Sequence, residues 1–111
     1  MIQKMRHAAT AMLIAVAVTA STSCTGRTPR SYVVSMMSMA FQPADLKVDR
    51  GDTIVWKNDD FLPHTATARD SSWDSKSVDA GASWRYVADK PGRYAYYCMF
   101  HPNMQGTIEV R

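Results

Sequence analysis

The side chains of this 111-residue chain best suited to hold a metal ion lie in one C-terminal segment and one upstream loop. The segment Cys-Met-Phe-His-Pro-Asn-Met carries Cys98, His101 and Met104, and His64 follows Pro63 in the loop. A thiolate and two imidazoles can form a trigonal plane around copper, with a thioether as a long axial contact. This donor set accepts both Cu(I) and Cu(II), so the pattern predicts one copper ion held by these four side chains.

Other uses of the same residues stay open at this stage. Zinc is normally held by Cys, His and carboxylate side chains, and Met is not among them. Cys98 could act as a nucleophile with His101 as its base, but no orienting group or oxyanion motif accompanies them. A disulfide between Cys24 and Cys98 cannot be judged from sequence spacing. Met104 could also be an ordinary core side chain, the commonest fate of a single Met.

The elements that would position these residues are short strands. Apolar residues alternate with polar ones in brief runs separated by turn residues, and no stretch shows helical periodicity. About seven or eight strands at this spacing predict an all-β sandwich or small barrel. Tyr94, Tyr96 and Cys98 alternate on one face, so Cys98 ends a strand. A further strand is expected over His64–Ala68, and the metal would then join two parts of the sandwich.

The N-terminal residues resemble a secretory signal and not part of the domain. Lys4 and Arg6 precede an apolar run over residues 8–20, and small residues follow. The run is about 13 residues, shorter than the roughly 18–20 of a membrane-spanning helix, although a retained N-terminal anchor stays an alternative. We predict a signal over residues 1–23, a flexible leader over 24–31 and the folded domain over 32–111. Cys24 is either a lipidation site, in a weak lipobox, or part of a leader cleaved after Ala20.

The charge of the chain excludes one class of partner. Without Lys4 and Arg6 the 13 basic residues become 11, against 10 acidic residues. These charges are scattered singly, whereas nucleic-acid binding needs a basic stripe, so no nucleic-acid partner is expected. The folded segment of roughly 80 residues is small enough that a bound metal would help to stabilise it.

Several motifs resemble those of the cupredoxins, in particular the amicyanin, plastocyanin and pseudoazurin group. The resemblance covers most of residues 41–110 through Phe41-x-Pro43, Gly51-Asp52-Thr53-x-Val55-Trp56-x-Asn58, Pro63-His64, Pro91-Gly92-x-Tyr94-x-Tyr96-Tyr97-Cys98 and His101-Pro102-x-Met104-x-Gly106. It implies a Greek-key β-sandwich of eight strands with one Cu(I)/Cu(II) ion at one end. It also implies a carrier of single electrons between partner proteins such as a dehydrogenase, cytochrome or reductase. The predicted signal places this carrier in the periplasm or otherwise outside the cytoplasm, and we expect it to be a monomer.

The resemblance also implies roles for residues around the ligands. Family members commonly have Asn after the first His ligand, so we expect Thr65 to take over the hydrogen bonds that hold the Cys loop. We also expect Pro63, which precedes His64, to support the ligands from outside. His101 is expected near the surface, within an apolar patch that docks a redox partner; the alternative is that these residues bury one another. The predicted docking residues are Phe61, Leu62, Phe100 and Pro102, with Met99 and Pro63 beside them. Tyr97 is either a second electron entry point or a surface strand residue.

Two competing functions use the same residues. A copper chaperone or storage protein would need an open site and often extra Met or His ligands. Met36, Met37 and Met39 are candidates, but near-consecutive strand positions point to both faces, which favours core and edge filling. An oxidase or reductase would need a second copper site, and this single domain offers none, so no enzymatic activity is expected.

Overall fold

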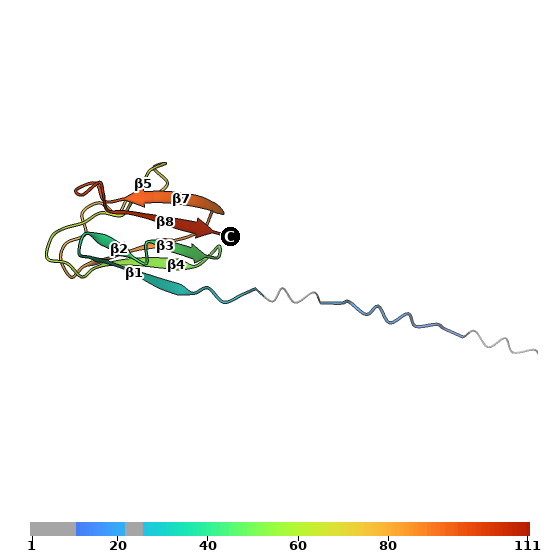
Figure 1. Cartoon of the computed structure of the whole chain (residues 1–111). Helices are drawn as coiled ribbons and strands as arrows, with labels where there is room; N and C mark the ends of the chain where they lie inside the picture. The colour runs from blue at the N-terminus through green and yellow to red at the C-terminus, as the bar shows by residue number, and fades with distance from the viewer. Residues whose placement is uncertain (1–10, 22–25) are drawn as a thin grey trace, which may run out of the picture.

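The computed structural model describes residues 11–21 and 26–111, and the domain is a sandwich of two four-stranded sheets (Figure 1). One sheet has the order β2-β1-β4-β6 and the other the order β3-β8-β7-β5. The strands are β1 (Ser31–Met37), β2 (Ala40–Gln42), β3 (Asp45–Val48), β4 (Thr53–Asn58), β5 (Thr67–Ala68), β6 (Ser83–Val87), β7 (Gly92–Tyr97) and β8 (Gln105–Val110). β1 pairs with β4, and β3 with β8, in parallel. The predicted all-β sandwich of about eight strands is confirmed.

An aromatic cluster fills the space between the sheets and supports the end of β7. Trp56 of β4 and Tyr96 of β7 are fully buried, with ring centroids 5.4 Å apart at a near-perpendicular angle. Trp73 and Phe41 complete the contact around them. Because side chains alternate along a strand, the inward direction of Tyr96 also turns Cys98 inward. The core therefore fixes where the thiol of Cys98 lies.

The predicted strand over His64–Ala68 is wrong in extent, because only Thr67 and Ala68 form β5. The backbone N–H of Thr65 donates to Cys98 Sγ at 3.3 Å, and that of Ala66 donates to Ser75 Oγ at 2.7 Å. These amides are therefore not available to a strand ladder. His64 makes only an isolated bridge, exchanging backbone hydrogen bonds with Val78.

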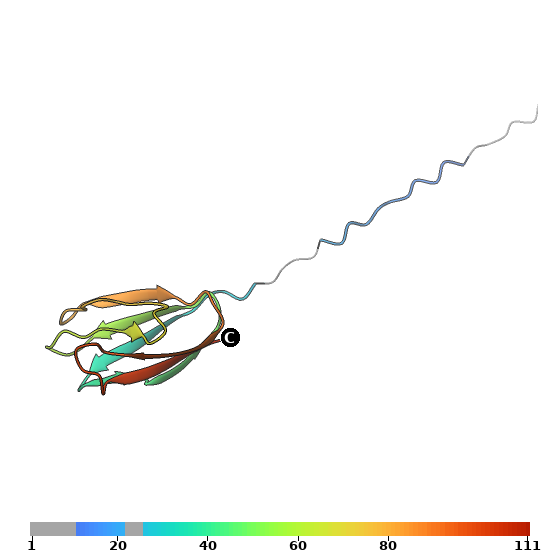
Figure 2. The same cartoon turned by 90° about the horizontal axis from the view of Figure 1, so that it is seen from above.

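The chain enters the domain at the end opposite the 98–104 loop, as both views show (Figures 1 and 2). Part of the predicted leader contacts the domain there. The Arg27 guanidinium pairs with Asp52 and with Asp49, and the backbone carbonyl of Arg30 accepts from Thr53 N–H at 2.8 Å. The chain is thus attached to the domain several residues before β1 begins.

The predicted signal over residues 1–23 lies partly outside the described residues, and so does Cys24. Residues 11–21 have no regular secondary structure and are exposed. Within residues 11–21 and 26–111 no helix is long and apolar enough to cross a membrane. The assignment of a signal and of a lipidation site therefore stays a prediction.

Replacing Asp52 by Asn is expected to lower the melting temperature at pH 7, with the difference disappearing in acid. Burial alone would raise the pKa of this carboxyl, but hydrogen bonds from Arg30 N–H, the Arg27 guanidinium and Asp49 N–H lower it to about 2. A carboxyl whose folded pKa lies below its unfolded value of about 3.9 contributes stability above that pH and loses it as pH falls through the folded pKa. Thermal unfolding of both proteins between pH 7 and pH 2 checks this. A pH-independent difference would contradict it.

Candidate metal centre

Three donor atoms from His64, Cys98 and His101 meet at the end of the sandwich opposite the leader. The two Nδ1 atoms are 3.2 Å apart, and Cys98 Sγ lies 3.8 Å from His64 Nδ1 and 3.6 Å from His101 Nδ1. Donors bound at about 2.0–2.3 Å to one metal at trigonal angles would be roughly 3.5–3.7 Å apart. The triangle therefore fits a single ion. Among the described residues it is the only such group of His, Cys or acidic side chains.

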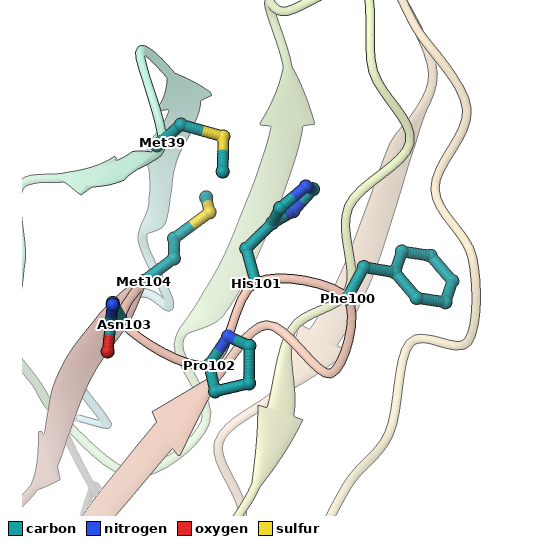
Figure 3. A pocket seen from close by; sticks show the side chains of 6 residues that line it. All are labelled: Met39, Phe100, His101, Pro102, Asn103 and Met104. Atoms are coloured by element: carbon teal, nitrogen blue, oxygen red, sulfur yellow. The ribbon is translucent and has the colours of Figure 1, made fainter.

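Backbone hydrogen bonds within segment 98–104 form a compact loop that keeps Met104 close to Cys98 and His101. Cys98 N–H donates to the Met104 carbonyl at 3.0 Å, His101 N–H to the Cys98 carbonyl, and Met104 N–H to the His101 carbonyl at 2.8 Å. Met104 is buried, and its thioether points toward that of Met39, with His101 beside it (Figure 3). The structure therefore places all four predicted ligand residues at one end of the domain.

Asp60 orients His64 and was not predicted from the sequence. His64 is fully buried, and its Nε2 lies 3.0 Å from Asp60 Oδ2. A carboxylate only accepts hydrogen bonds, so Nε2 carries the proton and the lone pair of Nδ1 faces Cys98 and His101. The hydrogen bond from His64 lowers the pKa of Asp60, and burial of the carboxyl opposes this shift. The only signal in the sequence was a carboxylate four residues before the histidine.

The Asp60 loop is itself held by a buried amide. Asn58 is fully buried at the end of β4, and its Nδ2 donates to the carbonyls of Leu62 at 2.8 Å and Val78 at 2.9 Å. Its Oδ1 accepts from Asp60 N–H at 2.9 Å. One amide thus fixes both ends of the turn that carries Asp60, and so the orientation of His64.

Thr65 makes two contacts with the Cys98 loop. Its backbone N–H donates to Cys98 Sγ at 3.3 Å, and its Oγ1 accepts from Met99 N–H at 2.8 Å. Thr65 is buried. The hydroxyl therefore receives a hydrogen bond from the residue next to Cys98, as expected for a side chain that holds the Cys loop.

The apolar side chains predicted to dock a partner are exposed, and Phe100 and Pro102 line one cavity with the half-buried His101. Phe61 is 86% exposed and Phe100 is 51% exposed, and Phe100 points away from His101 in Figure 3. We call this surface the His101 face. It consists of Phe61, Leu62, Pro63, Met99, Phe100 and Pro102, all exposed.

The three methionines near the end of β1 have different environments. Met36 is fully buried in the core and Met37 is exposed. Met39, which follows β1 in a left-handed turn, lines a cavity of about 460 Å³ together with His101 and Met104 (Figure 3). Core filling therefore describes Met36 only, and Met39 belongs to the surroundings of the metal centre.

Tyr97 lies beside the centre but on the outer face of β7. It is half-buried, and the Arg69 guanidinium carbon lies 4.4 Å from its ring centroid. A guanidinium over an aromatic face is an attractive cation–π contact. A basic side chain therefore covers the ring of Tyr97. The sequence around Tyr97 did not predict this contact, because Arg69 lies far from it along the chain.

Comparison with known proteins agrees with this architecture. The family model described as "Cupredoxin-like domain" matches residues 8–110. Amicyanin-alpha of Methylorubrum extorquens is 27% identical over 85 residues, which are 72% of this chain and 71% of that protein. Plastocyanin of Nostoc punctiforme is 32% identical over 91 residues, 66% of each chain. A Cu(I) structure of an amicyanin mutant superposes with a TM-score of 0.69 at 23% identity, covering 73% of this chain and 82% of the other. The chain belongs to the cupredoxin-like family.

Proposed function

We propose that this protein is a type 1 copper carrier of single electrons, with His64 Nδ1, His101 Nδ1 and Cys98 Sγ as equatorial ligands and Met104 as the axial ligand. The observation that carries the proposal is the triangle of three donor atoms with edges of 3.2, 3.6 and 3.8 Å. Copper would supply the Cu(I)/Cu(II) couple. The protein residues would hold its ligands in one arrangement that suits both oxidation states.

The relatives support the proposal of an electron carrier, and the N-terminal segment supports its location outside the cytoplasm. The matched relatives include amicyanins and plastocyanins, and the chain spans about two thirds of their length. The apolar segment over residues 8–20 supports export, so we place the carrier outside the cytoplasm. It would be a monomer that turns over no substrate, and lipidation of Cys24 would attach it to a membrane at the end opposite the copper.

The same attachment would leave the His101 face open to solution. We propose this face as the docking surface for redox partners such as dehydrogenases, cytochromes or reductases, because Phe100 and Pro102 line the same cavity as His101, the least buried of the four proposed ligands. Its exposed apolar residues suit weak and short-lived complexes. Phe61, Leu62, Phe100 and Pro102 would make most of the contact.

Phe100→Glu is expected to slow electron self-exchange between the oxidised and reduced protein by about tenfold, because two copies would then bring like charges together. The copper absorption should not change, since Phe100 points away from His101 (Figure 3). Line broadening in NMR spectra of mixed oxidation states gives the rate. Val87→Glu, an equally exposed position at the opposite end, is the matched control. Equal slowing by both variants, or loss of the copper band in Phe100→Glu, would contradict the docking role.

Tyr97 is a second candidate for electron entry. The Arg69 guanidinium over its ring favours a partner with an acidic surface, since the ring itself is only half-buried. The same self-exchange assay and assays with acidic and basic redox proteins apply to Tyr97→Ala. Unchanged rates with every partner would leave Tyr97 as a structural residue of β7.

Asp60→Asn is expected to raise the reduction potential by about 60 mV, equal to a tenfold loss in the preference for Cu(II) over Cu(I). Asn can keep the hydrogen bond to His64 Nε2 but removes the negative charge that strengthens the imidazole as a donor. Asp59→Asn is the matched control, because Asp59 contacts Lys57 and Ser35 instead of His64. Cyclic voltammetry measures both potentials. Equal shifts would show that the effect is general charge and not the contact with His64.

Copper delivery is the competing function. Met39 supports it, because a thioether beside Met104 in an open cavity could receive Cu(I). Mixing the copper-loaded protein with an acceptor apoprotein separates the two functions. Rapid transfer of copper would favour delivery, whereas retention of copper with fast electron exchange would favour the carrier.

A further inference from the structure

A line of hydrogen bonds connects the Cys98 loop with an acidic residue of the 69–82 connection. Met99 N–H donates to Thr65 Oγ1 at 2.8 Å, and Thr65 Oγ1 lies 2.9 Å from Thr67 Oγ1. Thr67 Oγ1 in turn donates to Asp74 Oδ1 at 3.1 Å. Thr65 and Thr67 are both buried, so their hydroxyls bond to these protein partners and water does not compete for them.

The direction of every bond in this line follows from Asp74. Hydrogen bonds from Lys76 N–H and from the Lys76 and Thr67 side chains lower the pKa of Asp74, and burial opposes this, so the group is a carboxylate at neutral pH. A carboxylate only accepts, and each hydroxyl has one proton. Thr67 therefore donates to Asp74, and Thr65 donates to Thr67. Thr65 Oγ1 then has only acceptor capacity left for Met99 N–H.

This line acts on the residue next to Cys98. Met99 is the second residue of the 98–104 loop, and its amide shares a peptide unit with the Cys98 carbonyl. That carbonyl also accepts from His101 N–H at 3.2 Å. Fixing the peptide therefore fixes the orientation of Cys98 and His101 together. The N–H of Thr65 contacts Cys98 Sγ directly, so one residue holds the thiol and its peptide.

We propose that Thr67 and Asp74 are positioning residues for Cys98, acting through Thr65 and Met99 as a directed hydrogen-bond relay. The proposal rests on the copper site proposed above. Thr65 alone could rotate its hydroxyl proton toward other acceptors. With the relay, its oxygen always presents a lone pair to Met99. The loop then keeps one geometry with and without the metal.

Thr67→Val, Thr67→Ser, Asp74→Ala and Asp74→Asn test the relay. Val is nearly isosteric but removes the hydroxyl, whereas Ser keeps it. Ala removes the acceptor at position 74, whereas Asn keeps an oxygen that can accept. Lys76→Gln serves as a surface control, because it removes the charge paired with Asp74 and leaves Oδ1 in place. Amide hydrogen exchange of Met99 in the copper-free chain is measured by NMR, with the buried residue Ile108 of β8 as the reference amide.

Thr67→Val and Asp74→Ala are expected to speed exchange at Met99 by about tenfold relative to Ile108, the scale of one net hydrogen bond. Thr67→Ser, Asp74→Asn and Lys76→Gln should stay near wild type. With copper bound, the first two variants should also weaken the thiolate charge-transfer band. If Thr67→Val and Asp74→Ala match wild type at Met99 while Thr65→Val does not, Thr65 acts alone and the relay is refuted. Absence of the band in wild type would refute the copper site, and exchange at Met99 would still decide the relay.

Discussion

Cys98→Ser should abolish the intense thiolate-to-copper absorption and lower the affinity for Cu(II) by more than about 100-fold. Loss of a hydrogen-bond partner of a ligand typically costs less than this, and here a ligand itself is lost. Cys98 is fully buried, and its Sγ lies within 3.8 Å of the Nδ1 atoms of both His64 and His101. A serine hydroxyl is a hard, neutral donor at neutral pH and cannot replace a thiolate in this plane. The visible spectrum and a chelator competition assay measure the two effects.

The same substitution should leave the sandwich folded. Burying a hydroxyl in place of a thiol costs about 1–3 kcal/mol, which the Thr65 N–H can partly offset. Far-UV circular dichroism and thermal unfolding check that the fold persists. Met104→Leu is the matched control, because it removes only the axial contact and should keep the band. A Cys98→Ser variant that retained the band would contradict the ligand assignment.

Gly106→Ala should destabilise the protein by about 3 kcal/mol, at the upper end of the usual cost of overpacking. A Cβ atom at this position would lie 2.5 Å from Tyr96 Cζ and 2.6 Å from its hydroxyl oxygen. Tyr96 is fully buried against Trp56 and Phe41, so these two side chains restrict movement of its ring. Gly106 lies two residues after Met104. A backbone shift that relieves the clash would therefore also displace the 98–104 loop.

Gly81→Ala is the control for this prediction. A Cβ at Gly81 meets no atom within 4 Å, but its φ of +78° is unfavourable for an L-residue. We expect a cost of about 1–2 kcal/mol from backbone strain alone. Chemical denaturation of the two variants gives the difference. An equal loss of unfolding free energy in the two variants would mean that the clash with Tyr96 does not destabilise Gly106→Ala beyond ordinary backbone strain.

The sequence identifies the four proposed ligand residues, but it does not identify most of the residues that hold them in place. Cys98, His101 and Met104 lie within seven residues, so their types and spacing alone indicate one centre. The role of Asp60 depends on the turn that Asn58 fixes, and no periodic pattern reveals such a turn. The same is true of Thr67 and Asp74, whose side chains meet only because the 69–82 connection folds back on β5.

Only part of the fold could be predicted from the sequence. Alternation over β7 predicts that Tyr94, Tyr96 and Cys98 share one face, and Tyr96 and Cys98 are indeed both fully buried, because side-chain direction along a strand has a fixed period. Trp73 is a buried core residue between polar neighbours, and alternation does not predict it. The shortened β5 results from two amides that bond to side chains outside the strand, those of Cys98 and Ser75. Tertiary contacts of this kind are absent from any local pattern.

The most direct test of the central claim is a Cu(II) titration of the purified protein followed in the visible spectrum, and then reduction. If His64, Cys98, His101 and Met104 bind copper as proposed, an intense orange-red absorption band will saturate at one copper per chain and disappear on reduction. Binding of copper without that band would show that the Cys98 thiolate is not an equatorial ligand, and the electron-carrier assignment would then be wrong.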